Sequence, residues 1–404
     1  MRILVILSLL LTSLAGCNVL TSQSTSQAQA PELIDDGWQT TAPVSAGFDP
    51  SALAALDREI RHGEWGNVHA LLIDRGGKLV YERYYSGPDW SYGKSHGTVR
   101  FGRKSLHDIR SNGKTIVALA LGAAQLEGRL LDLDEKLPNL LPDRRDLLEA
   151  EKASITLRHL LSMTSGLEWD EWSSPYGSPK NSLEPYLSAG DPNGWALSRP
   201  LEHEPGTNYT YSHASTQLLV EVIEAATALP FESFLTDRLL EPLEIYDVGW
   251  AADEIGGLPD MAGAMRLNAR DMAKFGRLVA DRGKWNGKQL IAAGFIDEMT
   301  QTQSTLRHIP GTPPEIVEGV DYSFQMWLFT YSSPDGPITV PAFSGNGEQR
   351  VSWIVEHDLV VTQYAGNYVG GGTPPDIWMP DRMLVSAILP AFGRAPKSSH
   401  SSTN

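Results

Sequence analysis

Ser111-Asn112-Gly113-Lys114 leads directly into an apolar run, Thr115-Ile116-Val117-Ala118-Leu119-Ala120-Leu121-Gly122-Ala123-Ala124. The run is apolar on all sides, which predicts a helix buried in a core rather than one lying on a surface. A serine at the start of such a helix packs poorly, but it stands beside unpaired backbone N–H groups that stabilise developing negative charge. The stretch therefore predicts a buried helix with a reactive serine at its N-terminus.

Lys114 completes a Ser-x-x-Lys pattern with Ser111. Residues three apart on a helix share a face, with about 5–6 Å between their Cβ atoms. If the site is closed to water, the ammonium loses solvation and its pKa falls, so the lysine can accept the serine proton. The pattern predicts an activated nucleophile, and the alternative is an ordinary N-cap serine. A second copy, Ser91-Tyr92-Gly93-Lys94, lies in a turn-rich stretch and is not expected to be catalytic.

The N-terminus predicts the compartment. The segment Ile3–Leu11 is typical of a secretory signal and is too short to span a membrane. It is followed by Leu14-Ala15-Gly16-Cys17, which is similar to the lipobox of bacterial lipoproteins, and Cys17 is the only cysteine in the chain. We therefore expect lipidation of Cys17 and a lipid anchor in a bacterial envelope membrane. Asn18, in place of an aspartate, favours the outer membrane, facing the periplasm, if the cell is Gram-negative.

Length and charge exclude several classes of protein. A chain of 404 residues is long enough for one large domain or two closely packed ones. The net charge of -16 argues against a nucleic-acid partner, which requires a basic surface. The sequence contains no His-Glu-x-x-His, no Gly-x-Ser-x-Gly and no complete P-loop, and one cysteine cannot build a cysteine metal site. We therefore expect no metal and no cofactor.

Local patterns predict strands at both ends of the chain and helices between them. Asp49-Pro50-Ser51 starts a helix, and residues 68–85 and 350–364 each read as an antiparallel hairpin. The expected organisation is a sheet built from both ends of the chain, with a helical region inserted between them. The expected boundaries are a signal peptide over 1–16, a flexible tether over 17–36, a folded domain over 37–393 and a disordered tail over 394–404.

Several ordered motifs resemble those of the serine β-lactamase-like hydrolases, which include class C β-lactamases, D-Ala-D-Ala peptidases, esterases and aminohexanoate-dimer hydrolases. The resemblance runs from about Phe48 to about Phe392 and is carried, beside Ser111 and Lys114, by Leu160–Leu167, Pro205–Ser212, Leu240–Leu243 and Asn268–Gly276. It implies an α/β, β-lactamase/transpeptidase-like fold, in which an antiparallel sheet flanked by helices carries a mainly helical inserted domain. The sheet part is expected at about 47–105 and 255–393, and the helical part at about 106–254.

The resemblance implies that Tyr211 is the second catalytic element. Beside a charged lysine the phenolate is favoured, so Tyr211 can relay protons between Ser111 and a leaving group. The alternative is a buried core tyrosine with a hydrogen-bonded hydroxyl. The family's Tyr-x-Asn reads Tyr211-Ser212-His213 here, and His213 either replaces the asparagine or is a locally satisfied histidine.

The third element of penicillin-binding members, Lys-Thr-Gly or His-x-Gly, is replaced by Ser344-Gly345-Asn346-Gly347. The missing cation weakens the case for a β-lactam or D-Ala-D-Ala substrate, although Arg350 lies close enough in sequence to supply one. Glycines there let substrate approach a strand edge whose N–H, with that of Ser111, forms an oxyanion hole. The alternative is a plain turn leading into a strand.

Aromatic residues of the following loop, Trp169, Trp172 and Tyr176, either contact substrate or only hold the loop in place, and Tyr176 is the preferred substrate contact. The sequence as a whole predicts a serine hydrolase that acts through an acyl-enzyme on a small ester or amide. One alternative is a true β-lactamase or D-Ala-D-Ala carboxypeptidase. Another is a non-catalytic binding lipoprotein on the same fold, because fold does not guarantee activity.

Overall fold

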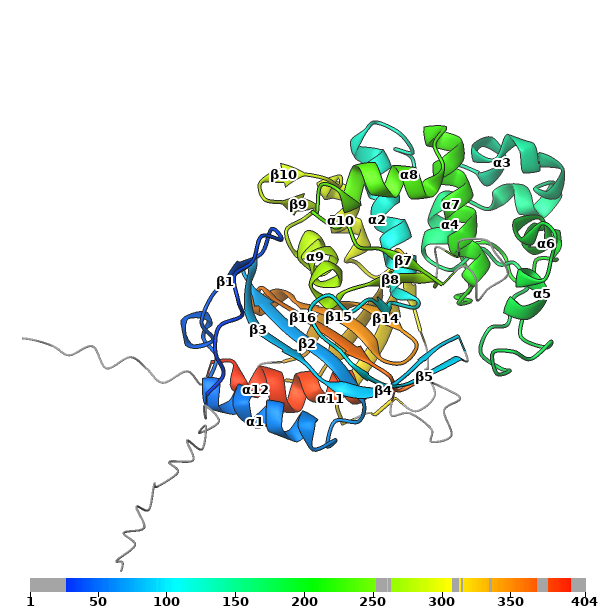
Figure 1. Ribbon diagram of the computed structural model, residues 1–404. Helices are drawn as coiled ribbons and strands as arrows, with labels where there is room; N and C mark the ends of the chain where they lie inside the picture. The colour runs from blue at the N-terminus through cyan, green and yellow to red at the C-terminus, as the bar shows by residue number, and fades with distance from the viewer. Residues whose placement is uncertain are drawn as a thin grey trace, which may run out of the picture.

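The computed structural model describes residues 27–92, 94–251, 260, 263–306, 312–313, 315–333, 336–368 and 377–393. Within these residues one large sheet has the strand order β1-β3-β2-β16-β15-β14-β13-β12-β11, and all neighbours are antiparallel except β1 and β3 (Figure 1). Its strands are β1 (Gln39–Thr40), β2 (Val68–Arg75), β3 (Lys78–Tyr84), β11 (Ser304–Thr305), β12 (Val317–Tyr322), β13 (Trp327–Tyr331), β14 (Ile338–Gly345), β15 (Gln349–Ile354) and β16 (Leu359–Ala365).

The centre of the sheet joins the two ends of the chain. Strand β16 pairs with β2, with Val361 opposite Ile73, and nearly every residue of both strands is buried. Continuous apolar runs suit strands that are covered on both faces. The two predicted hairpins, the sheet made from both ends of the chain and the α/β fold class are therefore confirmed.

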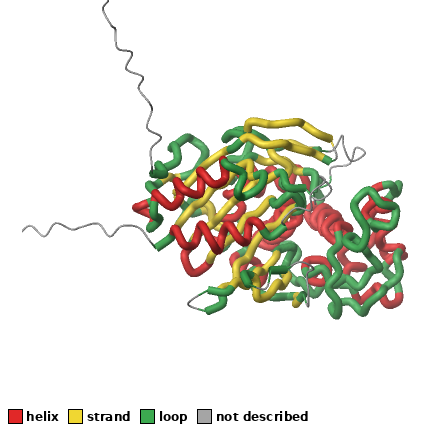
Figure 2. The backbone as a smooth tube through the Cα atoms, turned by 90° about the horizontal axis from the view of Figure 1, so that it is seen from below, coloured by secondary structure: helices red, strands yellow, loops and turns green. Residues whose placement is uncertain are grey.

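One face of the sheet is covered by helices from the extreme ends of the folded region, as Figure 2 shows. They are α1 (Pro50–Arg61), α11 (Met379–Met383) and α12 (Leu389–Ala391). The predicted start of α1 is confirmed, since the Asp49 carboxylate accepts a hydrogen bond from the Ser51 N–H at 2.8 Å. The rings of Phe48 and Phe392 meet edge to face at 5.3 Å, so the ends of the resembling region lie side by side.

The other face is covered by α2 (Asn112–Leu126) and α9 (Ala269–Ala280). Helix α9 packs directly on the strands, because a Cβ added to Gly276 would lie 2.5 Å from Val351 Cγ1 and 2.7 Å from Val360 Cγ1. Helix α2 is buried over Asn112–Ala124, which confirms the helix predicted from its apolar run. It lies between the sheet and the helical region (Figure 1).

The helical region extends away from the sheet beside α2 (Figure 1). Its helices are α3 (Leu137–Leu140), α4 (Leu157–Leu161), α5 (Leu183–Leu187), α6 (Pro192–Ser198), α7 (His213–Thr227) and α8 (Phe231–Leu235), and α10 (Ala293–Met299) packs on α2. Helix α7 begins at His213, because the Ser212 hydroxyl accepts a hydrogen bond from the Ser215 N–H and caps it.

Small sheets complete the fold. Strands β4 (Ser86–Ser91) and β5 (Lys94–Arg100) form a hairpin, β6 (His107–Asp108) pairs with β8 (Met265–Leu267) and β8 with β7 (Gly249–Trp250), and β9 (Lys284–Trp285) pairs with β10 (Lys288–Gln289). Ser91 therefore lies in a strand rather than in a turn. It is buried while Lys94 is exposed, so no buried serine–lysine pair forms there.

The part of the predicted tether that the structure describes, residues 27–36, packs against the domain. The Arg270 guanidinium donates to the Asp36 carboxylate at 2.6 Å and to the Glu32 carbonyl at 2.8 Å. A buried arginine requires such partners. Residues 27–36 are therefore part of the folded domain, although their composition indicated a tether. The signal segment, Cys17 and the tail 394–404 lie outside the described residues.

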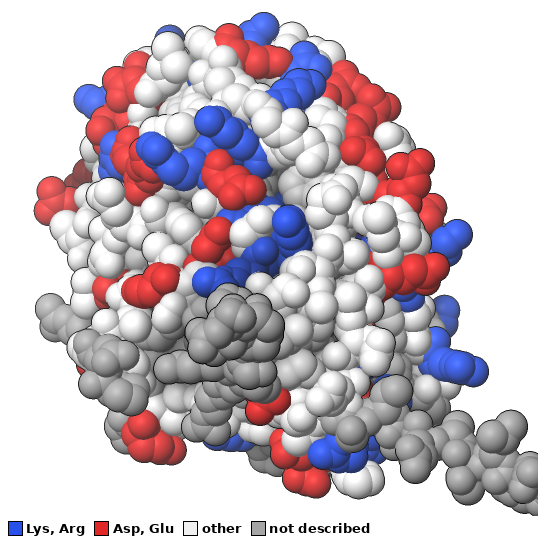
Figure 3. All heavy atoms as spheres, turned by 90° about the vertical axis from the view of Figure 1, so that its left-hand side faces the viewer, with Lys and Arg blue, Asp and Glu red and all other residues white. Residues whose placement is uncertain are grey.

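No helix among the described residues is long and apolar enough to cross a membrane. Figure 3 shows one face of the molecule, on which basic and acidic side chains are interspersed rather than gathered into separate patches.

Candidate functional site

Ser111 occupies the turn that opens α2, and the backbone before it is unusual. Arg110 has a φ of +53°, a left-handed conformation that non-glycine residues adopt at a cost. Ser111 returns to the helical region with φ -62° and ψ -3°, and its side chain does not cap the helix. The ordinary N-cap role is thus not the one Ser111 performs, and its hydroxyl stays available.

The structure brings Lys114 and Tyr211 to Ser111. The Lys114 ammonium lies 5.1 Å from the centre of the Tyr211 ring, and the Tyr211 hydroxyl is within hydrogen-bonding reach of both Ser111 and Lys114. Lys114 is 2% exposed and Tyr211 is 8% exposed. The three side chains expected to act together therefore form one cluster, in which Lys114 and Tyr211 are buried and Ser111 is partly exposed.

The protonation state of Lys114 differs from the sequence-based expectation. Burial is the largest influence and would lower the pKa of Lys114, as predicted. It is outweighed by Tyr211, whose hydroxyl accepts a hydrogen bond from the ammonium, and by the negative charges of Glu171 and Asp260, which together raise the pKa above its ordinary value. Lys114 is therefore a buried ammonium in the resting site rather than a free base.

The Tyr211 hydroxyl is also protonated at rest. Burial raises the pKa of Tyr211, while the charge of Lys114 and hydrogen bonds from Ser111 and Lys114 oppose the rise. The same contacts that fail to ionise the phenol at rest stabilise the phenolate once it forms. The cluster therefore holds a proton donor that becomes a base when its proton is removed.

His213 faces Lys114 at the position of the family's asparagine. Its Nδ1 lies 3.5 Å from Lys114 Nζ, and its Nε2 lies 2.9 Å from Asp260 Oδ1. An ammonium only donates, so His213 Nδ1 is the acceptor in its contact with Lys114. His213 thus offers Lys114 an acceptor, as an asparagine carbonyl would.

Glu171 is a further buried charge that the sequence pattern did not reveal. Its Oε2 accepts from the Trp169 indole at 3.0 Å and from the His213 backbone N–H at 2.9 Å, and its Oε1 accepts from the Tyr176 hydroxyl at 3.3 Å. A lone acid between aromatic residues in a loop follows no periodic pattern. The sequence pattern did not reveal Asp260 either, because Asp260 lies beside α7 only in the folded chain.

Gln325 joins the elements that carry the cluster. Its backbone carbonyl accepts from the Thr115 hydroxyl of α2 at 2.6 Å, and its side-chain oxygen accepts from the Thr216 hydroxyl of α7 at 2.7 Å. Its amide nitrogen donates to the Leu160 carbonyl at the end of α4 at 2.8 Å. The backbone and side chain of this one residue therefore bind three helices beneath the site.

The segment Ser344–Glu348, called the glycine loop from here on, lies against the N-terminal turn of α2. A Cβ added to Gly345 would lie 2.6 Å from the Ile109 carbonyl and 3.2 Å from the Ser111 nitrogen. Gly345 also extends beyond the last pairing of β14 with β13, which is Ala342 with Trp327. The end of this strand therefore lies beside the Ser111 N–H, with no room for a side chain.

Contacts with Tyr368 and with β16 hold the rest of the loop in place. Gly347 has a φ of +84° and lies against the ring of Tyr368, so only glycine fits there, and Asn346 is part-exposed at the tip. The Gln349 amide donates to the Ala365 carbonyl at 2.6 Å and accepts from the Ala365 N–H at 3.2 Å. Gln349 therefore attaches the loop to β16.

Arg350 does not supply the missing cation. It forms a buried ion pair with Asp381 of α11 at 3.2 Å and lies over the Phe329 ring at 4.3 Å. Helix α11 covers the opposite face of the sheet from α2. Although Arg350 is close in sequence to Ser344–Gly347, its side chain is therefore bound on the opposite face of the sheet.

Aromatic residues border the cluster and an adjacent hollow. Trp172 stacks on Tyr211 at 5.0 Å and is 51% exposed, whereas Trp169 is buried and holds the loop. Tyr176, the expected substrate contact, is 47% exposed and hydrogen-bonds Glu171. The hollow beside Trp172 has a volume of about 750 Å³, and the described residues that line it are uncharged: Thr164, Trp172, Gly206, Thr207, Asn208, Tyr209, Gln303, Ser304, Thr305 and Leu306.

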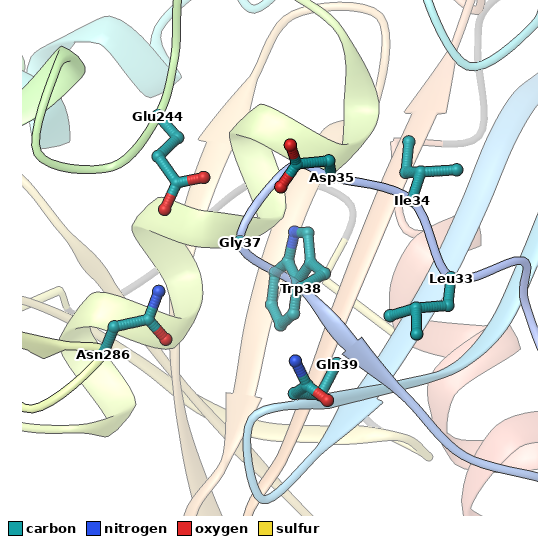
Figure 4. Close-up of a pocket in the computed structure, with 8 residues that line it drawn as sticks. All are labelled: Leu33, Ile34, Asp35, Gly37, Trp38, Gln39, Glu244 and Asn286. Atoms are coloured by element: carbon teal, nitrogen blue, oxygen red, sulfur yellow. The ribbon is translucent and has the colours of Figure 1, made fainter.

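A second hollow, of about 620 Å³, lies between the N-terminal segment and Glu244 and Asn286 (Figure 4). Its other lining residues are Leu33, Ile34, Asp35, Gly37, Trp38 and Gln39. Neither Ser111 nor its partners line it, so it is separate from the candidate site.

The chain belongs to the beta-lactamase family, whose model matches residues 58–361. A curated relative, Protein flp of Staphylococcus aureus, is 26% identical over 176 residues, which is 44% of this chain and 33% of that protein. This chain therefore spans about a third of that relative's length.

Solved structures share the fold. A putative 6-aminohexanoate-dimer hydrolase from Bacillus anthracis has a TM-score of 0.61 at 18% identity, covering 82% of each chain. A family VIII carboxylesterase has a TM-score of 0.62 at 16% identity, covering 84% of this chain and 96% of the other. The resemblance and the β-lactamase/transpeptidase-like fold expected from the motifs are thus confirmed.

Glu348, in the glycine loop, predicts a dependence of stability on pH. Its Oε2 accepts from the Asn367 amide at 2.6 Å, yet burial raises the pKa of Glu348 from 4.5 to about 7 against that bond and Arg350. Folding therefore favours the protonated acid, and stability falls as pH rises from about 4.5 through 7, by about 3 kcal/mol in total.

Glu348→Gln keeps the acceptor for Asn367 and should remove most of this decline. The measurement is the urea unfolding midpoint at pH 5 and pH 8, with the exposed Glu356→Gln in the neighbouring hairpin as control. Equal pH dependence in the wild type and Glu348→Gln would contradict the assignment.

Proposed function

We propose that this member of the beta-lactamase family is a serine hydrolase that forms an acyl-enzyme on Ser111 and cleaves small, neutral esters or amides. The observation that carries the proposal is the contact of Ser111, Lys114 and Tyr211 at the N-terminus of a buried helix. A buried ammonium beside a phenol and a free serine hydroxyl suits nucleophilic catalysis and has little value for packing.

In the proposed mechanism Ser111 Oγ attacks the substrate carbonyl carbon while its proton passes to the Tyr211 phenolate. Lys114 stabilises that phenolate, which is a minor form at rest because the pKa of Tyr211 is raised. The Ser111 N–H and the end of β14 at Gly345 stabilise the oxyanion. Tyr211 then protonates the leaving alcohol or amine, leaving an ester on Ser111. Water attacks this ester and gives a proton to Tyr211, which passes it to Ser111 Oγ as the bond from Ser111 to the acyl carbon breaks, so that the acid and the free serine hydroxyl are released.

The surroundings of the cluster support a neutral substrate. The hollow beside Trp172 is lined by uncharged side chains, and its tryptophan stacks on Tyr211. The loop Ser344–Gly347 carries no cation, and Arg350 is paired with Asp381. An acyl or alcohol group against Trp172 is therefore the occupant we propose for this hollow.

The nucleophile is tested by covalent labelling. A fluorophosphonate probe should modify Ser111, as read by mass spectrometry of peptides, and Ser111→Ala should lose roughly 10⁴-fold or more in turnover. Ser91→Ala is the matched control, since it also begins a Ser-x-x-Lys sequence. Full activity in Ser111→Ala, or labelling elsewhere in the chain, would reject the proposal.

His213 should act as a positioning residue through Lys114. His213→Leu removes the acceptor of a buried ammonium, and leaving a buried donor unsatisfied costs about 1–3 kcal/mol, or about one to two decades in kcat/KM. His213→Asn restores a carbonyl acceptor and should stay within about tenfold of wild type. Rescue by asparagine but not by leucine, with KM little changed, is the expected pattern. Equal activity of the two variants would show that the acceptor has no role.

Substrate preference follows from the missing cation. A lost charge-assisted hydrogen bond costs about 1.5–3 kcal/mol, so p-nitrophenyl acetate and butyrate should have higher kcat/KM than nitrocefin. Arg350→Ala is a poor test of carboxylate binding, because it breaks a buried ion pair with Asp381. A higher kcat/KM for nitrocefin would assign the protein to the β-lactamases proper.

The lipid anchor at Cys17 stays a proposal that the sequence alone supports. Wild-type protein expressed with its signal should partition with membranes and carry lipid on Cys17, and Cys17→Ser should not. The soluble form is best begun at residue 27, because residues 27–36 pack on the domain. An unmodified Cys17 in mature protein from cells would overturn the proposal.

A further inference from the structure

Three buried side chains with metal-ligating atoms converge beside the turn that leads to Ser111. They are His69 of β2, Asp89 of β4 and His107 of β6, which are 0%, 5% and 1% exposed. His69 Nδ1 lies 2.8 Å from His107 Nε2, which in turn lies 3.9 Å from Asp89 Oδ1. The three atoms all lie within 4.8 Å of one another.

The tautomer of His107 is fixed by its other nitrogen. His107 Nδ1 lies 3.0 Å from the backbone carbonyl oxygen of Asp108, which can only accept a hydrogen bond. Nδ1 therefore carries the hydrogen, and in the neutral ring Nε2 carries a lone pair. That lone pair points at His69.

The tautomer of His69 is fixed in the same way, through Asn67. The Asn67 amide nitrogen donates to the Pro88 carbonyl at 2.7 Å, which orients the amide so that its oxygen faces the His69 ring. His69 Nε2 lies 3.1 Å from that oxygen and donates to it. The lone pair of the neutral ring is therefore on Nδ1, and it points at His107.

Two lone pairs thus face each other across 2.8 Å, an arrangement that repels unless a positive charge lies between them. The Asp89 Oδ1 is buried and has no hydrogen-bond partner among the described residues. A cation would satisfy all three atoms.

We propose that His69, His107 and Asp89 bind one divalent transition-metal ion, of which Zn²⁺ fits the ligand set best. Two imidazoles and a carboxylate are common ligands for such ions. The hydrogen bonds to Asp108 and Asn67 are the outer partners that metal-binding histidines characteristically have.

To receive the ion, the two rings must separate slightly and the Asp89 carboxylate, 3.9 Å from His107 Nε2, must move closer to them. Tetrahedral zinc with Zn–N bonds of about 2.05 Å holds two nitrogens about 3.3 Å apart, so the rings must separate by about half an ångström. The rings are otherwise held in place, since His69 stacks on Phe101 at 4.0 Å and His107 on Tyr364 at 4.8 Å.

The ion would be structural rather than catalytic, and the proposal is independent of the proposed hydrolase activity. It ties the β4–β5 hairpin to the large sheet and to β6, four residues before Ser111. The same strand carries Asp108, whose carboxylate accepts from the Ser91 hydroxyl at 2.8 Å and pairs with Arg110 at 3.0 Å. The site would therefore stiffen the turn that sets the nucleophile.

The test uses untagged full-length protein, because a histidine tag would itself bind metal. Protein stripped with a chelator is titrated with Zn²⁺ and, separately, with Co²⁺, whose visible absorption reports nitrogen and oxygen ligands. Metal content is measured by mass spectrometry after dialysis. The variants are His69→Gln, Asp89→Asn and Asn67→Ala, and His96→Gln on the exposed side of the same hairpin is the matched control.

One tightly held ion per wild-type chain is expected, with a melting temperature several degrees above that of the stripped protein. His69→Gln and Asp89→Asn should weaken binding by more than 100-fold, Asn67→Ala by about 10- to 100-fold, and His96→Gln not at all. No retained ion in the wild type would overturn the proposal, even if a variant fails to fold. Equal binding by Asp89→Asn and wild type would also overturn it.

Discussion

The site depends on one constraint, the burial of the Lys114 ammonium between the sheet and the helical region. An isolated buried charge costs far more than a domain's net stability, so its neighbours must compensate it. They come from three distant segments: Glu171 from the loop after α4, Tyr211 and His213 from the start of α7, and Asp260 from beyond it. The contacts that bring these segments to Lys114 are therefore also the contacts that pack α7 on α2. The fold and the site form together.

The position of Ser111 is set by the sheet, on the side of the site opposite to the helical region. Strand β6 ends three residues before Ser111, and Arg110 between them adopts a left-handed backbone. Such strain persists only where the surroundings hold it. Here Asp108 pairs with Arg110, and the end of β14 at Gly345 lies so close to the Ile109 carbonyl that a side chain would not fit between them. The helix therefore supplies the lysine and the sheet supplies the serine, and the two meet at the first turn of α2.

Local patterns were enough for the parts of the fold that are local. Helix α1 and the two hairpins follow from a cap, an apolar period and turn residues, and Ser111 and Lys114 lie within one helical turn. Glu171, Asp260 and the His69–Asp89–His107 cluster could not be predicted, because each gains its partners only through contacts between distant segments. The β4–β5 hairpin was missed for another reason: Gly87 and Pro88 suggested turns, but both lie in an antiparallel strand.

The pKa of Lys114 shows why the missed residues matter for function. Burial alone lowers it, and that is all the sequence shows; two carboxylates and a phenol reverse the direction. With the lysine charged and the phenol neutral at rest, the proposed mechanism uses Tyr211, rather than Lys114, as the group that exchanges protons with Ser111. The carboxylates have a second consequence: with Glu171 and Asp260 opposite one ammonium, the field at the nucleophile does not favour an anionic substrate. The charges that hold Lys114 ionised thus also argue for the neutral ester or amide that the uncharged hollow beside Trp172 would accept.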